Sequence, residues 1–128
     1  MKYTVSIDVP SIDEGLTFYS AAFGFAETAR PVDGYAILKC GDAEIGLLEK
    51  PAGTKPAQGS DDVRRYVRHW TPVHVDFSVA EFDVVLSAAL RAGAKCEQKF
   101  SAGEHPPVAF CSDPFGNGFC IIGQRTAP

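Results

Sequence analysis

Apolar and polar side chains alternate along several short segments of the chain, and longer segments repeat apolar residues at helical spacing. In residues 3–9 the apolar side chains alternate with Thr4, Ser6 and Asp8, which predicts a half-buried strand. Residues 12–23 place apolar side chains three or four positions apart, which predicts an amphipathic helix. Three further short strands are expected at residues 26–30, 35–40 and 44–49.

The predicted helix has recognisable signals at both ends. Ser11 can accept a hydrogen bond at its start, and Glu14 stands three residues later, as in a capping box. Gly24 follows the helix and can adopt the left-handed conformation that ends it. The signals at Ser11 and Glu14 place a short turn between the first strand and the helix, and Gly24 marks where the helix ends.

The same pattern occurs a second time. Residues 4–16 align with residues 74–86, with identical side chains at Val5/Val75, Val9/Val79, Asp13/Asp83 and Leu16/Leu86. The second copy is predicted to contain a strand at 74–79, a helix at 81–92, and strands at 95–100, 108–112 and 118–124. A repeat of this length indicates two copies of one supersecondary unit. We therefore expect a single domain over residues 1–128, made of a module at 1–49, a linker at 50–70 and a module at 71–124.

The linker lacks the alternating pattern. It combines prolines, glycines and charges of both signs, and a helical turn is expected only near residues 61–66. Arg64, Arg65 and Arg68 are most simply a solvated helix face, although one of them could meet an anionic substrate. Trp70 is expected to anchor the linker by packing, or else to stack on a ligand.

Strand alternation predicts which side chains share a surface. If the apolar set of each first strand packs under its helix, the polar set faces away from the helices. The open face then carries, on the first strands, Thr4, Ser6, Asp8, His74, Asp76 and Ser78. On the last strands it carries Gly46, Leu48, Cys120, Ile122 and Gln124. The expected fold is α+β, with two βαβββ modules forming a curved mixed sheet around an open cleft.

Composition and charge narrow the class of protein. The 128 residues are 45% hydrophobic and 22% charged, as in a compact globular domain. The net charge of −4 argues against nucleic acid or an anionic membrane as partner. The chain has no long apolar run and its first residues lack a signal peptide, so we expect a cytoplasmic protein. The four cysteines form no CxxC pair and are expected to be free thiols.

Two segments give the pattern a family likeness. The first helix ends in FYSAAFGF, and DPFGNGF leads into the last strand. Together with the duplicated module, these motifs resemble the vicinal oxygen chelate superfamily over nearly the whole chain. This superfamily includes glyoxalase I enzymes, extradiol dioxygenases, fosfomycin-modifying thiol transferases and bleomycin-binding resistance proteins. We interpret DPFGNG itself as a turn that joins two strands and not as a catalytic segment.

The resemblance implies up to four metal ligands on the open face, one from the first and one from the last strand of each module. The matching positions here are Thr4, Gly46, His74 and Cys120. Only His74 is a typical ligand, and Cys120 could bind a soft metal as a thiolate. Asp8 and Asp76 share the face but are expected to lie too far along their strands to join His74 on one ion. No cofactor is expected, and a divalent Zn, Ni, Mn or Fe ion is the alternative.

These residues favour a metal-independent small-molecule binder of the drug-resistance or sequestration type. The expected ligand-binding cleft is lined by Thr4, Ser6, Asp8, Tyr35, Leu48, Trp70, His74, Asp76, Cys120 and Ile122. Its aromatic residues suit a flat or hydrophobic ligand, and the negative net charge favours a cationic one. The first alternative is a glyoxalase- or dioxygenase-like enzyme with an unusual ligand set centred on His74. The second is a structural or regulatory domain with a closed cleft. A homodimer is expected from the resemblance.

Overall fold

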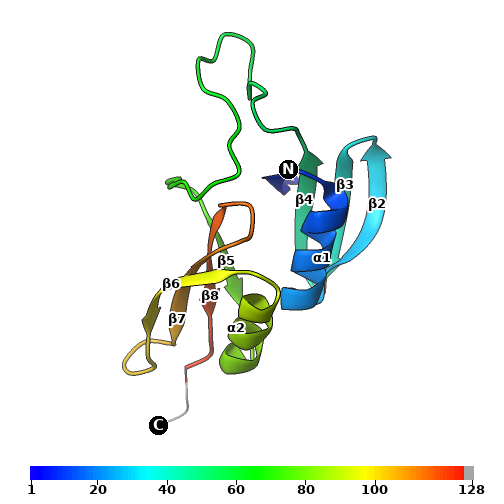
Figure 1. The fold of residues 1–128 in the computed structure, drawn as a ribbon. Helices are drawn as coiled ribbons and strands as arrows, with labels where there is room; N and C mark the ends of the chain where they lie inside the picture. The colour runs from blue at the N-terminus through cyan, green and yellow to red at the C-terminus, as the bar shows by residue number, and fades with distance from the viewer. Residues whose placement is uncertain (126–128) are drawn as a thin grey trace.

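The computed structural model describes residues 1–125 and contains two βαβββ modules joined by a long linker (Figure 1). The elements of the first module are β1 (Val5–Val9), α1 (Ile12–Phe23), β2 (Ala26–Val32), β3 (Tyr35–Cys40) and β4 (Ala43–Glu49). Those of the second are β5 (Val75–Ser78), α2 (Phe82–Arg91), β6 (Lys95–Phe100), β7 (Val108–Ser112) and β8 (Gly118–Ile122). The duplicated order predicted from the repeat is confirmed.

Each module builds one four-stranded mixed sheet. The strand orders are β1-β4-β3-β2 and β5-β8-β7-β6, so the two sheets have the same topology. In both, the first strand pairs in parallel with the last, and the remaining pairs are antiparallel. The parallel pair is possible because α1 or α2 carries the chain across the sheet between them.

Several predicted strand ends differ from the structure. β1 begins at Val5 and β5 at Val75, so Thr4 and His74 lie immediately before their strands. β8 ends at Ile122: the amide of Gly123 still donates to the carbonyl oxygen of Pro107, which lies opposite it in the β7–β8 register, but Pro107 has no N–H to return a ladder bond. β2 continues to Val32, beyond its predicted end, through an irregular pairing with β3.

Helix α1 has the predicted ends. The side chain of Ser11 accepts a hydrogen bond from the Glu14 amide, and its hydroxyl donates to the Glu14 carboxylate, both at 3.0 Å. Gly24 ends the helix in the left-handed conformation with φ of 85°. Helix α2 has no side-chain cap at its N-cap residue Glu81 and is two residues shorter than predicted.

An aromatic cluster forms the core between the two modules. Phe18, Tyr19 and Phe23 of α1 pack with Phe77 of β5 and Phe119 of β8. The rings of Phe23 and Phe77 are stacked with their centroids 4.2 Å apart. Helix α1 therefore packs on its own sheet and on the helix-covered face of the other sheet, which fixes the relative position of the modules.

The linker forms no regular structure between Glu49 and Val75, so the helical turn predicted at residues 61–66 is wrong. In Figure 1 it is the long green segment that rises beyond the strands before it returns to β5. The path of the linker is set by contacts with side chains that are far away in the sequence, described below, and not by a periodic pattern within the linker. Within residues 1–125, no helix combines the length and the apolar character needed to cross a membrane.

Candidate functional site

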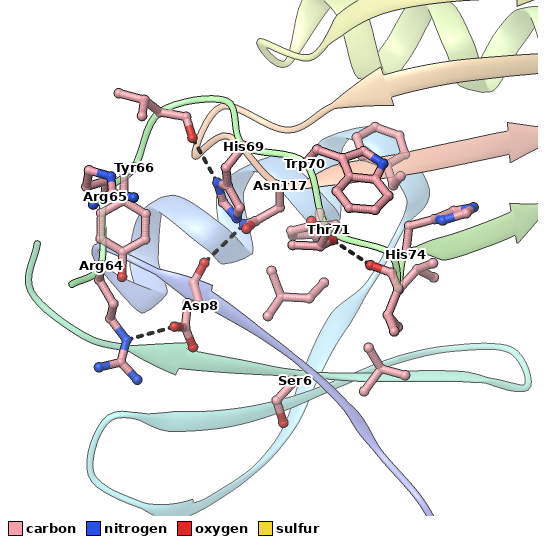
Figure 2. Close-up of a pocket in the computed structure, with 18 of the residues that line it drawn as sticks. Ser6, Asp8, Arg64, Arg65, Tyr66, His69, Trp70, Thr71, His74 and Asn117 are labelled. Atoms are coloured by element: carbon pink, nitrogen blue, oxygen red, sulfur yellow. Dashed lines mark hydrogen bonds and ion pairs between the residues drawn. The ribbon is translucent and has the colours of Figure 1, made fainter. Parts of the chain in front are cut away.

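A cavity of about 700 Å³ lies between the two modules. One wall is residues 5–8 of β1, and the opposite wall is made by residues 73–75 and Phe77 of β5 together with residues 117–119. Residues 62–67 and 69–71, together with Tyr19 of α1, contribute the rest (Figure 2). Figure 2 shows Asp8, Arg64 and Tyr66 at one end of the cavity and Trp70 and His74 at the other. The cavity therefore joins residues from all three segments of the chain.

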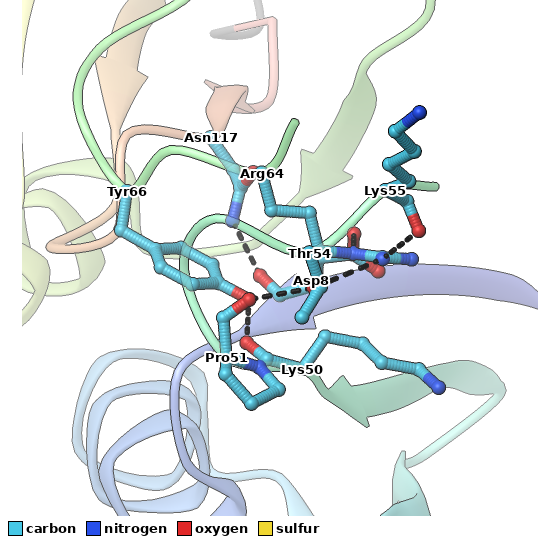
Figure 3. Close-up of polar contacts among 8 residues, drawn as sticks. All are labelled: Asp8, Lys50, Pro51, Thr54, Lys55, Arg64, Tyr66 and Asn117. Carbon is cyan, nitrogen blue, oxygen red and sulfur yellow. Dashed lines mark hydrogen bonds and ion pairs between the residues drawn. The ribbon is translucent and has the colours of Figure 1, made fainter. Parts of the chain in front are cut away.

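An ion pair ties the linker to the first module. Arg64 Nε donates to Asp8 Oδ2 at 2.7 Å, and the side chain of Arg64 is only 12% exposed. The same guanidinium also donates to the hydroxyl of Thr54 and, at 2.9 Å, to the carbonyl oxygen of Lys55 (Figure 3). Arg64 thus joins both arms of the linker to β1. This buried position contradicts the interpretation of Arg64 as part of a solvated helix face.

Tyr66 makes a second attachment close to the first. Its hydroxyl donates to the carbonyl oxygen of Lys50 at 2.5 Å. Burial raises the pKa of Tyr66, and the nearby carboxylate of Asp8 raises it further. The phenol therefore stays protonated and donates this hydrogen bond. The bond joins residue 66 of the linker to residue 50 at its start, beside the cavity.

The DPFGNG turn links the two modules as well as two strands. Asp113 accepts hydrogen bonds from the Phe115 and Asn117 amides and, at 2.7 Å, from the hydroxyl of Tyr19 on α1. The side-chain amide of Asn117 donates to the carbonyl oxygen of Asp8 at 3.1 Å. Burial, followed by the Asp113 carboxylate, raises the pKa of Tyr19 well above its ordinary value. This turn is structural, as expected, and it also holds β1 against the cavity.

The open face of the first module does not fit a metal ion. A Cβ at Gly46 would lie 2.6 Å from the hydroxyl oxygen of Tyr35, whose ring fills the space over this glycine. That hydroxyl is 3.0 Å from Ser6 Oγ. Thr4 donates to the Glu44 carboxylate at 3.0 Å, which lowers the pKa of Glu44. Two of the four positions implied by the family resemblance are therefore without an available ligand, and no chemistry through a four-ligand metal site follows.

The second module gathers three potential ligands. Single donor atoms of His74, Asp76 and Cys120 all lie within 4.8 Å of one another. His74 Nε2 is 3.1 Å from Asp76 Oδ1. Burial raises the pKa of the Cys120 thiol to about 11, and the Asp76 carboxylate contributes to the shift. The thiol is therefore neutral near pH 7, and the face presents a histidine–carboxylate pair beside a protonated sulfur.

The expectation that Asp76 is too far from His74 is wrong. Residues two apart on one face of a strand are separated by only about 6.6 Å along the backbone. The two side chains lean toward each other and cover that separation. Asp8, by contrast, is turned to Arg64 and is not a member of this group.

A smaller cavity of about 300 Å³ lies on the open face of the second sheet. Arg68 forms part of its wall, donating from Nε and Nη2 to the Glu97 carboxylate at 2.6 and 3.1 Å. A Cβ at Gly118 would lie 2.9 Å from the Arg68 guanidinium, so this glycine allows the arginine to cross β8. Trp70 and His74 line both cavities, which are adjacent at these residues.

The residues predicted to line one cleft fall into three groups: those that line the larger cavity, those that line the smaller cavity and those that line neither. Ser6, Asp8, Trp70 and His74 line the larger cavity, and Trp70, His74 and Cys120 line the smaller one. Thr4, Tyr35, Leu48, Asp76 and Ile122 line neither. The expectation that Trp70 anchors the linker by packing is wrong, because the residue is 78% exposed.

Apart from Trp70, the residues of the linker and of the last turn that line the cavity were not predicted to do so. The cavity includes Tyr66, His69, Thr71 and Asn117 among them. His69 Nδ1 donates to the carbonyl oxygen of Val67 at 2.9 Å. No local signal in the sequence could have identified them, because the linker is positioned by contacts over long sequence separations such as Arg64–Asp8.

Comparisons with known proteins agree with this architecture. The profile of the family described as "Glyoxalase-like domain" matches residues 4–122. A glyoxalase/bleomycin resistance protein/dioxygenase family enzyme from Burkholderia phytofirmans is similar in structure, with a TM-score of 0.65, 21% identity, and 94% of this chain and 95% of that chain covered. A glyoxalase/bleomycin resistance protein from Albidiferax ferrireducens has a TM-score of 0.69, 16% identity and coverages of 97% and 98%.

A third similar structure is the fosfomycin resistance protein FosX from Listeria monocytogenes. Its TM-score is 0.70 at 11% identity, with 97% of this chain and 93% of that chain covered. No curated protein matches the sequence. At such low identity these structures establish the fold alone, over essentially the whole chain.

Proposed function

Since the chain belongs to the glyoxalase-like domain family, we propose that it binds a small organic molecule, without a metal ion, in the cavity between its two modules. The cavity itself carries the proposal. Its volume of about 700 Å³ lies within the ordinary range for small-molecule sites, roughly 300–1,000 Å³. Structurally similar proteins include ones named for bleomycin or fosfomycin resistance, and we propose a resistance or sequestration role for this protein.

Metal independence rests on the donor set of the first module. The phenol of Tyr35 stands over Gly46, and the hydroxyl of Thr4 is engaged by Glu44. A catalytic zinc site normally has three protein ligands and an open position. The first module supplies none of these ligands.

The chemistry of the cavity wall suits a flat molecule with a polar edge. Tyr66 and Trp70 provide aromatic surface, while Thr71 and Asn117 provide polar groups. The carboxylates of Asp8 and Asp62 are already paired with arginines, at 2.7 and 3.0 Å. Preference for a cationic ligand therefore rests on the net charge of −4 and not on an unpaired carboxylate in the wall.

A matched pair of substitutions tests the proposal. Val73 lines the cavity and is 77% exposed, whereas Val84 lies on α2 away from it and is 61% exposed. Both can become tyrosine at little cost to the fold. We expect bleomycin or a planar cationic dye such as acridine orange to raise the melting temperature of the wild type and of Val84→Tyr, but not of Val73→Tyr. Equal shifts in both variants, or none in the wild type with either probe, would contradict the proposed site.

A metal-dependent enzyme of glyoxalase or dioxygenase type is the second candidate. The grouping of His74, Asp76 and Cys120 favours it, with Zn, Ni, Mn or Fe as the ion. Elemental analysis of untagged protein discriminates between the two. Near-stoichiometric metal that is lost in His74→Ala would overturn metal independence, while probe binding that survives treatment with EDTA would support it.

We further propose a cytoplasmic homodimer. The outer strand β2 is exposed along nearly its whole length and leaves a sheet edge free for a second copy. Sedimentation at two or more concentrations tests the dimer independently of ligand binding.

A further inference from the structure

Cys96 and Cys111 occupy directly opposite positions on neighbouring antiparallel strands. Cys96 lies on β6 and Cys111 on β7, and the two are paired in the register of the second sheet. Opposite residues of an antiparallel pair have Cα atoms about 4.5–5.5 Å apart. A disulfide bond needs about 4.4–6.8 Å between the same atoms. The backbone therefore already holds these two cysteines at bonding separation.

The two thiols differ in exposure. Cys96 is exposed on the outer strand, and Cys111 is buried beneath it. Burial raises the pKa of the Cys111 thiol to about 12, and the neighbouring Cys96 thiol contributes to the shift. An oxidant in solution can therefore reach the thiol of Cys96, while the thiol of Cys111 next to it is protected by burial.

The other cysteines are less suited to react with Cys96. Cys111 is paired with Phe119 on β8, so the next residue, Cys120, points to the opposite face of the sheet. Cys40 lies in the first module, where its thiol donates to the carbonyl oxygen of Phe23. Pairing geometry thus selects one partner out of three.

We propose that Cys96 and Cys111 form a site of oxidative modification, at which a hydroperoxide converts the two thiols into a cross-strand disulfide. The Cys96 thiolate attacks one peroxide oxygen, the O–O bond breaks, and a sulfenic acid forms as hydroxide or alkoxide leaves. The sulfur of Cys111 then attacks the sulfur of Cys96, the S–O bond breaks, and water leaves with the proton of the Cys111 thiol. Two thiols are oxidised by two electrons, and the peroxide is reduced to water and, for an organic peroxide, an alcohol.

The sequence makes the product easy to identify. Trypsin cleaves after Lys95 and Lys99, which isolates Cys96 in the short peptide CEQK. The next peptide, residues 100–125, contains both Cys111 and Cys120. After treatment of the reduced, full-length protein with hydrogen peroxide, we expect non-reducing mass spectrometry to find these two peptides linked. The four titratable thiols of the chain should fall to two.

Single substitutions assign the bond. The link should persist in Cys120→Ser and in Cys40→Ser, and should be lost in Cys111→Ser. Because Cys96 is exposed, Cys96→Ser is a second variant that leaves the core unchanged, and it keeps the test valid if Cys111→Ser misfolds. In Cys96→Ser the three remaining thiols should stay reduced under the same treatment. The proposal is overturned if Cys96 becomes a sulfinic acid or joins a second chain while Cys111 stays reduced. It is also overturned if the link persists in Cys111→Ser.

Discussion

The phenol ring of Tyr35 lies over the α-carbon of Gly46, and its hydroxyl group is hydrogen-bonded to the hydroxyl of Ser6 on β1. β3, β4 and β1 are thereby joined on the open face of the first sheet. Where the family resemblance implies a ligating side chain, this protein has an aromatic ring supported by a hydrogen bond. Because the Tyr35 ring occupies the space over Gly46, this contact favours metal-independent ligand binding over metal chemistry. The contact itself can be tested by substitution.

Gly46→Ala should destabilise the protein by about 1–3 kcal/mol, because the new methyl group must displace the Tyr35 ring. In a Tyr35→Ala background the same change should cost much less. Urea unfolding of the four proteins in a double-mutant cycle measures the difference. Gly103→Ala, where a Cβ would meet no atom within 4 Å, is the control. An equal cost in both backgrounds would show that the ring does not occupy this space.

Arg64→Met should release the linker from β1. The substitution keeps most of the apolar stem but removes the hydrogen bonds to Asp8 and Lys55, a loss of about 1.5–3 kcal/mol for a charge-assisted contact. Hydrogen exchange and limited proteolysis should accelerate at residues 50–70. Arg65→Met is the matched control, because the side chain of Arg65 is 61% exposed and, among residues 1–125, forms an ion pair with Asp62 alone. Indistinguishable behaviour of the two variants would refute this role of Arg64.

Tyr19→Phe should weaken the attachment of the first helix to the DPFGNG turn. The buried Asp113 loses the hydrogen bond from the phenol, which should cost about 1–3 kcal/mol in urea unfolding. Tyr3→Phe, at an exposed position, should change stability by much less. If Tyr19→Phe were as stable as the wild type, the hydrogen bond from Tyr19 to Asp113 would not contribute to holding the modules together.

Alkaline pH should destabilise the fold through its buried thiols. Burial first, and the neighbouring Cys96 second, raise the pKa of Cys111 from 9.0 to about 12. Between these values the unfolded chain releases a proton that the folded chain keeps, so the free energy of unfolding falls as pH rises. Below pH 9.0 this group contributes no pH dependence. Unfolding curves from pH 8 to 12 should show a shallower decline for Cys111→Ala, and an unchanged decline would assign the effect to other groups.

Much of the fold was predictable because its signals are local. The repeat of residues 4–16 in residues 74–86 gave two modules, and alternation in the first strands gave the correct open face. Ser11 and Gly24 marked the ends of α1, since capping depends on neighbouring backbone groups.

Other features could not be derived from local patterns. Arg64 was assigned to a solvated helix face, yet it is held by Asp8, a residue 56 positions away. Nothing in the spacing of prolines, glycines and charges along the linker specifies such a partner. The proximity of His74 to Asp76 was missed for a different reason, because the lean of two side chains along a strand decides it.

The sequence by itself determined the duplicated βαβββ architecture and the face of each sheet that stays open. These follow from residue identity and from periodicities of two and 3.6, which act over a few residues. Only the tertiary structure decided that Tyr35 fills the space over Gly46, that the linker closes a cavity beside β1, and that Cys96 lies opposite Cys111. Those relationships depend on how separate segments pack against one another, and packing is a property of the whole chain.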